Sequence, residues 1–165
     1  MLYMSRIILG IDPGFAILGW GIIESNGGGR RIENVQWGAI LTKSGEPIEN
    51  RLLKIYQELK VIIDLYNPNE IALEKVFFNN NAKTIIGVAQ VQGLVFLLSA
   101  IMDIPIFQYT PLQAKNALTG YGVANKQQVQ NMLKLILKLE DFPRPDDAAD
   151  AVALAFCHLQ TRKYL

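Results

Sequence analysis

Apolar residues follow one another almost without a break over residues 7–11, and Asp12 ends this run. An unbroken apolar segment of this length predicts a central strand that is buried on both faces. The Pro-Gly pair that follows suits the middle positions of a type II turn, which predicts a hairpin into a second strand over 17–24. A third strand is predicted over 32–42, after the glycine-rich turn SNGGGR.

A helical pattern begins after the third predicted strand. Apolar residues repeat every three or four positions over 47–66, which predicts a helix that the Asn-Pro pair at 67–68 ends. A short strand, EIALEKV, follows, and a long helix is predicted from about Ala82. The segment IPIFQYT then predicts a fifth strand.

Three further helices complete the predicted order of elements. Thr110 is placed to cap a short helix that Pro111 opens and that the GYG segment at 120–122 ends. Another helix is predicted over 126–139, and the last begins near RPDDAAD. Three hairpin-linked strands, followed by strands and helices in alternation, predict an α/β fold with a mixed five-stranded sheet and helices on both faces.

The composition is that of one folded globular domain over residues 1–165, with enough chain for a three-layer core. Half of the residues are apolar and 19% are charged, which excludes a disordered chain. Cys157 is the single cysteine, so no internal disulfide can form, and this usage fits a reducing cytoplasm. The first residues, MLYMSRIILG, lack the pattern of a signal peptide.

The segment 84–102 contains no charged residue, because the nearest ones are Lys83 and Asp103. Its length and apolar character predict a helix that is buried in the core or in a dimer interface, with a membrane span as the alternative. Gly87 and Gly93 within this helix would let another backbone come close.

Positive charge is concentrated in the second half of the chain, although the net charge is only +1. The segment 75–139 has six lysines and a single acid, which leaves a local excess of +5. If these lysines share one face, that face attracts phosphate groups; if they are scattered, they are only solvated. The six are Lys75, Lys83, Lys115, Lys126, Lys134 and Lys138.

Carboxylates stand at the ends of predicted apolar elements. Asp12 ends the first strand and Glu74 lies in or just after IALE, so the two meet if these strands are adjacent and parallel. Asp147 and Asp150 are three residues apart and share one face of the last helix. Aspartate is also favoured at a helix start as a cap, but capping needs one residue, and here Asp146 makes three within five positions.

Like charges this close are unstable without a cation, so a divalent metal explains their clustering. All of the ligands would be hard oxygen atoms, which indicates Mg²⁺ or Mn²⁺ rather than zinc. His158 is not expected to join them, because eight helical residues beyond Asp150 correspond to about 12 Å. Two ions about 4 Å apart can activate a water and stabilise the leaving oxygen of a phosphodiester, which predicts a nuclease or phosphoryl-transfer site.

The motifs GIDPG....GWG, ALEKVFF, TPLQAKNALTGYGVANKQQVQ and DDAADAVALA stand in the order and spacing of the RuvC family of Holliday-junction resolvases. The chain resembles this family over nearly its whole length. The resemblance implies a ribonuclease H-like fold and a homodimeric, Mg²⁺-dependent endonuclease that nicks two opposing strands of a four-way DNA junction. It also implies action with the RuvA and RuvB branch-migration proteins.

The resemblance also implies roles for single residues. Lys115 and Lys126 match family lysines near the scissile phosphate and the DNA backbone. Phe77 matches an aromatic residue that stacks on a base at the opened junction, with plain core packing of Phe77 or Phe78 as the structural alternative. The residues that match the catalytic metal ligands of the family are Asp12, Glu74, Asp147 and Asp150.

Asp146 leaves a second register open, in which Asp146 and Asp150, four residues apart, are the paired ligands. We prefer Asp147, because Asp146 directly follows Pro145 and suits the helix cap.

Two rival functions share part of the pattern. Another ribonuclease H-like nuclease, YqgF-like or RNA-processing, would have Asp12 but need not have Lys115 and Lys126. A junction-binding protein without catalytic activity would have no need of four carboxylates.

Overall fold

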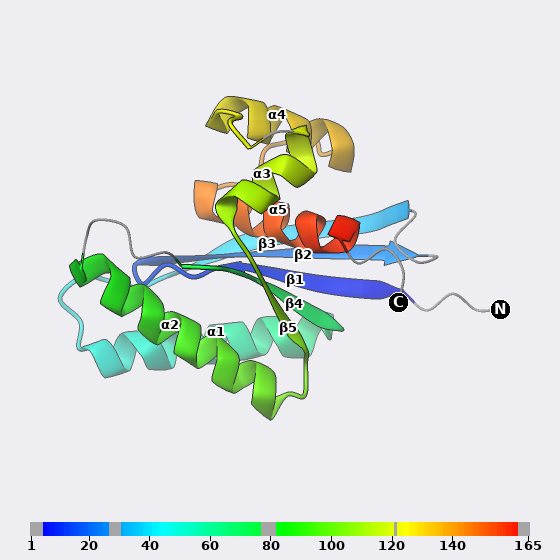
Figure 1. Cartoon of the computed structure of the whole chain (residues 1–165). Helices are drawn as coiled ribbons and strands as arrows, with labels where there is room; N and C mark the ends of the chain where they lie inside the picture. Colours follow the sequence, from blue (N-terminus) through cyan, green and yellow to red (C-terminus); the bar gives the residue numbers. More distant parts are fainter. Residues whose placement is uncertain (1–4, 27–30, 77–81, 121, 162–165) are drawn as a thin grey trace.

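The computed structural model describes residues 5–26, 31–76, 82–120 and 122–161 (Figure 1). The strands are β1 (Arg6–Asp12), β2 (Ile17–Asn26), β3 (Arg31–Leu41), β4 (Glu70–Glu74) and β5 (Ile106–Tyr109). They form one sheet in the order β3-β2-β1-β4-β5. β1 is antiparallel to β2 and parallel to β4, while β2 is antiparallel to β3 and β4 is parallel to β5. The predicted mixed five-stranded sheet is therefore confirmed.

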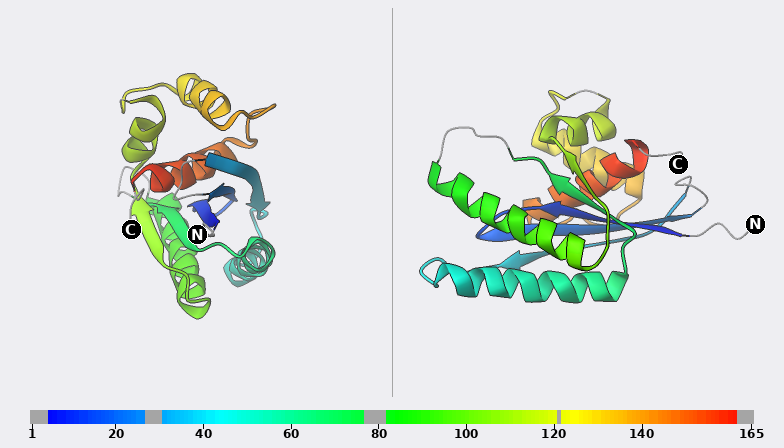
Figure 2. Two further views of the ribbon diagram at one scale, coloured as in Figure 1. Left: turned by 90° about the vertical axis from the view of Figure 1, so that its right-hand side faces the viewer. Right: turned by 60° about the horizontal axis from the view of Figure 1, so that its bottom comes forward.

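Helices cover both faces of this sheet. Those in the described residues are α1 (Ile48–Tyr66), α2 (Ala82–Ile101), α3 (Pro111–Thr119), α4 (Lys126–Leu137) and α5 (Asp146–Thr161). Figures 1 and 2 show α1 and α2 on one face, and α5 on the other with α3 and α4 outside it. Leu9 and Ile11 belong to the core on the α1 side, whereas Ile8 belongs to the core on the α5 side. Burial on both faces explains why β1 is apolar throughout.

Local sequence signals set the helix ends. Thr110 caps α3 as predicted: its side chain accepts a hydrogen bond from the Gln113 N–H, and the Gln113 side chain accepts one from the Thr110 N–H. A capping box of the same kind opens α4. Lys138 has a left-handed backbone with a φ of 53°, so α4 ends at Leu137 rather than at the predicted Leu139.

The connection between β1 and β2 differs from the predicted type II turn. Such a turn needs a positive φ at its third residue, and Gly14 does not have one. The Gly14 N–H instead donates to the carbonyl oxygen of Asp12 over 3.0 Å. A Cβ at Gly14 would lie 1.9 Å from the carbonyl oxygen of Ile17, so glycine is needed here for a close approach of backbone.

The apolar helix α2 has one buried side and one exposed side. Val91, Val95 and Leu98 are fully buried in the core beneath the sheet. Other apolar side chains of α2 are 40% to 61% exposed, namely Ile86, Phe96, Leu97 and Ile101. Burial in the core therefore explains the apolar residues on one side of this helix but not those on the exposed side. Among the helices in the described residues, none is long and apolar enough to cross a membrane.

Candidate active site

The first two candidate carboxylates lie at the ends of adjacent strands. β1 and β4 run parallel with Ile11 beside Leu73, and Asp12 and Glu74 follow these two residues directly. The two acidic side chains are partly buried and share a hydrogen bond. They meet at the carboxyl ends of parallel strands, as the sequence predicts.

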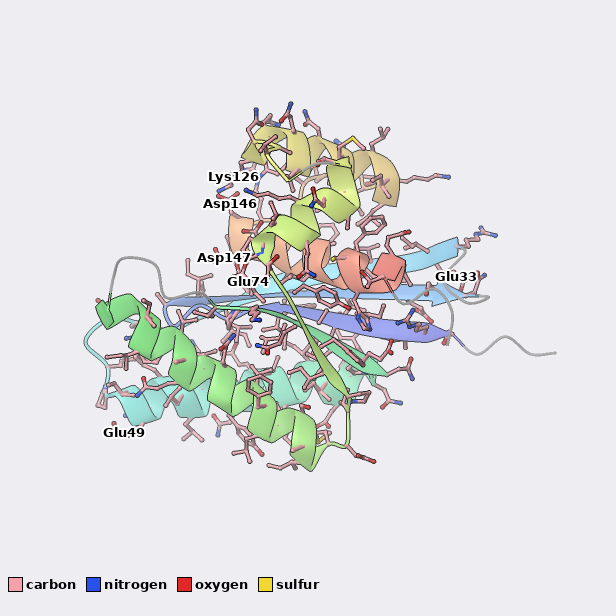
Figure 3. The ribbon with its side chains drawn as sticks, in the orientation of Figure 1. Glu33, Glu49, Glu74, Lys126, Asp146 and Asp147 are labelled. Carbon is pink, nitrogen blue, oxygen red and sulfur yellow. The ribbon has the colours of Figure 1, made fainter. Side chains whose placement is uncertain are left out.

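Glycines on the sheet bring α5 close enough to add two more carboxylates. A Cβ at Gly19 would lie 1.9 Å from the carbonyl oxygen of Asp147, and one at Gly10 would lie 1.9 Å from that of Ala151. Atoms cannot approach so closely, so glycine is what lets α5 rest on β1 and β2. The N-terminal part of α5 then places Asp147 and Asp150 near the two acids at the strand ends. Figure 3 shows Asp147 beside Glu74.

Burial and mutual repulsion oppose ionisation of these acids. Burial, followed by the negative charges of Glu74, Asp150 and Asp147, raises the pKa of Asp12 to about 8. Burial and the charge of Asp150 also raise the pKa of Glu74, while the hydrogen bond with Asp12 opposes that shift. Burial and the neighbouring charges therefore favour the protonated form of Asp12 when no cation is bound, and the hydrogen bond with Glu74 fits a proton held between the two carboxyl groups.

The chemistry of the donor set fits a hard divalent cation. Four carboxylates from three separate segments supply only oxygen atoms. A bound cation would offset the repulsion that, together with burial, raises the pKa values of Asp12, Glu74 and Asp150. Within the described residues, no three acidic, histidine or cysteine side chains already close around one point. The carboxylates thus form an acidic cluster and not a preassembled cage.

A cavity of about 260 Å³ lies beside the acids, between α3, α4 and α5. Glu74 and Asp150 line it together with Lys115 and Lys126. Burial raises the pKa of Asp150, and the charges of Lys126 and Lys115 oppose that shift. Two of the six lysines therefore share one cavity with the acids, where a phosphate group would meet both kinds of charge.

Comparison with known proteins agrees with this site. The sequence model of the family described as Crossover junction endodeoxyribonuclease RuvC matches residues 8–158. The chain belongs to the RuvC family. RuvC of Thermotoga maritima is 48% identical over 159 residues, which cover 96% of this chain and 94% of that protein. RuvC of Brevibacillus brevis is 42% identical over 158 residues, which cover 96% and 94%.

Solved RuvC structures show the same fold. Thermus thermophilus RuvC matches with a TM-score of 0.83 at 31% identity, covering 95% of this chain and 96% of that one. The same protein in complex with a Holliday junction substrate gives a TM-score of 0.85 at 31% identity, with 95% of each chain covered. The yeast mitochondrial Holliday junction resolvase Ydc2, at 16% identity and a TM-score of 0.68, shares the fold over 99% of this chain and 82% of its own. The predicted ribonuclease H-like fold is confirmed.

Asp146 is directed toward α4. Its carboxylate forms an ion pair with Lys126 and accepts a hydrogen bond from Nε2 of Gln130 at 3.1 Å. The predicted capping role is wrong, because α5 begins at Asp146 and the Ala148 N–H donates to the carbonyl oxygen of Pro145 over 2.9 Å. Sequence reasoning missed Gln130, although its position one helical turn after Lys126 places both on one face of α4.

The two registers for the paired aspartates can now be compared. The charge of Asp147 raises the pKa of both Asp12 and Glu74, whereas Asp146 is not among the charges that act on either. In Figure 3, Asp147 lies with Glu74, while Asp146 lies with Lys126. The structure therefore brings Asp147, and not Asp146, to the acids at the strand ends.

Two other predicted features lie elsewhere. Phe77, together with its alternative Phe78, falls outside the described residues. His158 is fully buried near the end of α5, where its Nδ1 lies 2.6 Å from the Tyr109 hydroxyl. As the sequence predicts, it is not part of the acidic cluster.

Proposed function

We propose that this chain is a structure-specific endonuclease that resolves four-way DNA junctions by paired, symmetric nicks. The solved complex of the related Thermus thermophilus RuvC with a Holliday junction substrate supports this. The observation that carries the proposal is a cluster of four carboxylates beside two lysines in a member of the RuvC family. These residues are Asp12, Glu74, Asp147, Asp150, Lys115 and Lys126.

The chain is a metal-dependent nuclease by its family, and we propose Mg²⁺ as the metal, with two ions per site and Mn²⁺ as a substitute. Asp12, Glu74, Asp147 and Asp150 would hold the ions, and the other three acids all act on the pKa of Asp12. When bound, the ions supply the Lewis acidity that activates water and stabilises the leaving oxygen.

The protein's own groups prepare this site. Positive charge bound beside the acids would favour the ionised form of Asp12, whose pKa is raised by burial and by the neighbouring carboxylates. Lys115 and Lys126 hold the phosphodiester beside the acids, since phosphate contacts set the position of DNA on a protein. Phe77 stacks on a base at the opened junction.

Two nicks at symmetric positions require two active sites related by a two-fold axis, and we propose that α2 forms this dimer interface. Its exposed side carries large apolar residues, and beyond Lys83 the helix has no charge. A Cβ at Gly93 would meet no atom within 4 Å, so a partner helix could approach closely there. The dimer would cover a surface that is otherwise exposed to water.

The interface can be tested with a charge on α2. Leu97→Glu should convert a dimer into a monomer in sedimentation experiments and abolish paired nicking, because Leu97 is 59% exposed on the apolar side. Leu65→Glu on α1, where the side chain is 71% exposed, is the matched control and should remain dimeric. Equal sedimentation of both variants and the unaltered protein would place the interface elsewhere.

We also propose that residues 1–165 form one nuclease domain and that it works with RuvA and RuvB. We propose the cytoplasm as its location, which fits the presence of a single cysteine.

The substrate is tested by cleavage of a labelled four-way junction with a homologous core in Mg²⁺, beside duplex DNA and an RNA/DNA hybrid. Paired symmetric nicks on the junction alone are expected. Cutting of the hybrid would instead identify an RNA-processing nuclease of the same fold. Tight junction binding without any nick would identify a junction-binding protein.

A further inference from the structure

The ion pair between Lys126 and Asp146 joins the first residue of α4 to the first residue of α5. Both side chains remain accessible, at 64% and 55% exposed, and both line the cavity beside the acidic cluster. Gln130 donates to the second oxygen of the same carboxylate at 3.1 Å. In the DNA-free protein, Lys126 therefore faces a protein anion at the place where DNA phosphates would approach.

This ion pair is not needed to hold the two helices together. An exposed ion pair contributes little to stability, because water screens both charges. The packing of α4 depends on apolar residues instead: Val129, Leu133 and Leu137 are buried in the core that also contains α5. The main effect of Asp146 is therefore that it occupies the ammonium group of Lys126, which could otherwise bind another anion.

Carboxylate and phosphate oxygens are alternative acceptors for the same ammonium group. We propose that Asp146 competes with DNA phosphate for Lys126, so that DNA binding includes the exchange of a protein carboxylate for a backbone phosphate at this lysine. Asp146 then limits DNA affinity, although it contacts no DNA itself. The inference rests on the proposed function, because it takes Lys126 to be a DNA-binding residue.

The test measures the affinity for a fluorescent four-way junction in the absence of divalent metal, so that no strand is cut. Asp146→Asn should bind about two- to fivefold more tightly at low salt, the range expected for one exposed ion pair. This gain should shrink as salt rises, because salt screens exposed charges. Asp141→Asn is the matched control, since Asp141 is an exposed acid in the segment before α5, and its affinity should change clearly less.

A double-mutant cycle separates competition from general repulsion. Lys126→Gln should weaken binding, and adding Asp146→Asn to it should change nothing further. The proposal is overturned if the gain persists without Lys126 or equals that of Asp141→Asn, because Asp146 would then only repel DNA. It is also overturned if Asp146→Asn weakens binding, since Asp146 would then position Lys126, or if Lys126→Gln has no effect. Junction cleavage by the unaltered protein in Mg²⁺, run in parallel, shows whether the proposed function itself holds.

Discussion

The same three elements, β1, β4 and α5, carry charged side chains at both of their ends, and the two ends are built in opposite ways. One end gathers the acids Asp12 and Glu74 with the aspartates of α5. The other end brings Arg6 and Glu70 together with His158. The first end is a set of like charges, and the second is a set of groups that satisfy one another.

At the second end, each polar group finds a partner in the chain. Nε of Arg6 donates to Oε2 of Glu70 at 2.6 Å, and Nε2 of His158 lies 3.2 Å from the same oxygen. The His158 ring stacks on Phe107 with centroids 4.7 Å apart. Burial acts to raise the pKa of Glu70, but the hydrogen bond and charge of Arg6 overcome it, so this pKa is lowered.

The difference separates charges that serve folding from charges that serve binding. A folded chain stabilises a buried charge by pairing it, as it does for Glu70. Asp12 and Glu74 have no cation among the described groups that act on them most strongly, and the hydrogen bond between them does not prevent a rise in the pKa of either residue. Buried groups with perturbed pKa values are typical of functional sites. The acidic end therefore lowers the free energy of unfolding of the metal-free protein, and a bound cation would restore it.

The largest expected effect comes from removing a charge at the acidic end. Asp12→Asn should lower single-turnover junction cleavage by about 10³-fold or more, because a proposed metal ligand is lost. In EDTA at neutral pH the same change should raise the free energy of unfolding by about 1 kcal/mol, because asparagine needs no proton to be neutral in the folded protein. Cleavage assays and urea unfolding measure the two effects. Loss of both activity and metal-free stability would make Asp12 a structural residue.

The opposite response is expected at the paired end. Glu70→Gln should lower the free energy of unfolding by about 2 kcal/mol, since a charged hydrogen bond to Arg6 is removed at a mostly buried position. Cleavage per folded molecule should be nearly unchanged. Glu58→Gln is the control in urea unfolding, because its exposed pair with Lys54, at 3.7 Å, should contribute about 0.5 kcal/mol or less. If folded Glu70→Gln protein no longer cleaved junctions, the paired end would also serve catalysis, and the two ends would not differ in function.

A smaller effect is expected from pH. The pKa of Asp12 is about 8 in the folded protein, against 3.8 for an aspartate in water, so between these values only the folded state holds the proton. Metal-free stability should therefore fall as pH rises through this window, by at least about 1 kcal/mol, and Asp12→Asn should flatten the decline.

The paired end has the opposite pH dependence. Because the pKa of Glu70 is lowered, its stabilisation is present above its usual value and is lost as pH falls through the folded pKa. Urea unfolding in EDTA across both windows measures the two slopes. A slope unchanged by Asp12→Asn would show that this carboxyl titrates normally.

Much of the fold could be predicted because its signals are local. The apolar run of β1 predicted a strand buried on both faces, and Thr110 before Pro111 predicted the start of α3. The meeting of Asp12 and Glu74 followed from chain order, since a parallel pair places both strand ends at one edge.

Other features depend on segments that are distant in sequence. Gly19 is required by the backbone of Asp147, and Asp146 pairs with Lys126 on another helix. Neither approach can be deduced before the helices are placed on the sheet. The exposed side of α2 could not be predicted either, because a helix that is apolar on every side has no sequence pattern that distinguishes a core-facing side from an interface.

The most direct measurement tests both ends in one assay. It records how junction cleavage depends on Mg²⁺ concentration for the unaltered protein, Asp12→Asn and Glu70→Gln. The unaltered protein and Glu70→Gln should nick both opposing strands with the same Mg²⁺ dependence, and Asp12→Asn should nick neither at any Mg²⁺ concentration. Nicking by Asp12→Asn with the unaltered Mg²⁺ dependence, or its loss in folded Glu70→Gln protein, would contradict the assignment of the acidic end as the metal-dependent catalytic centre.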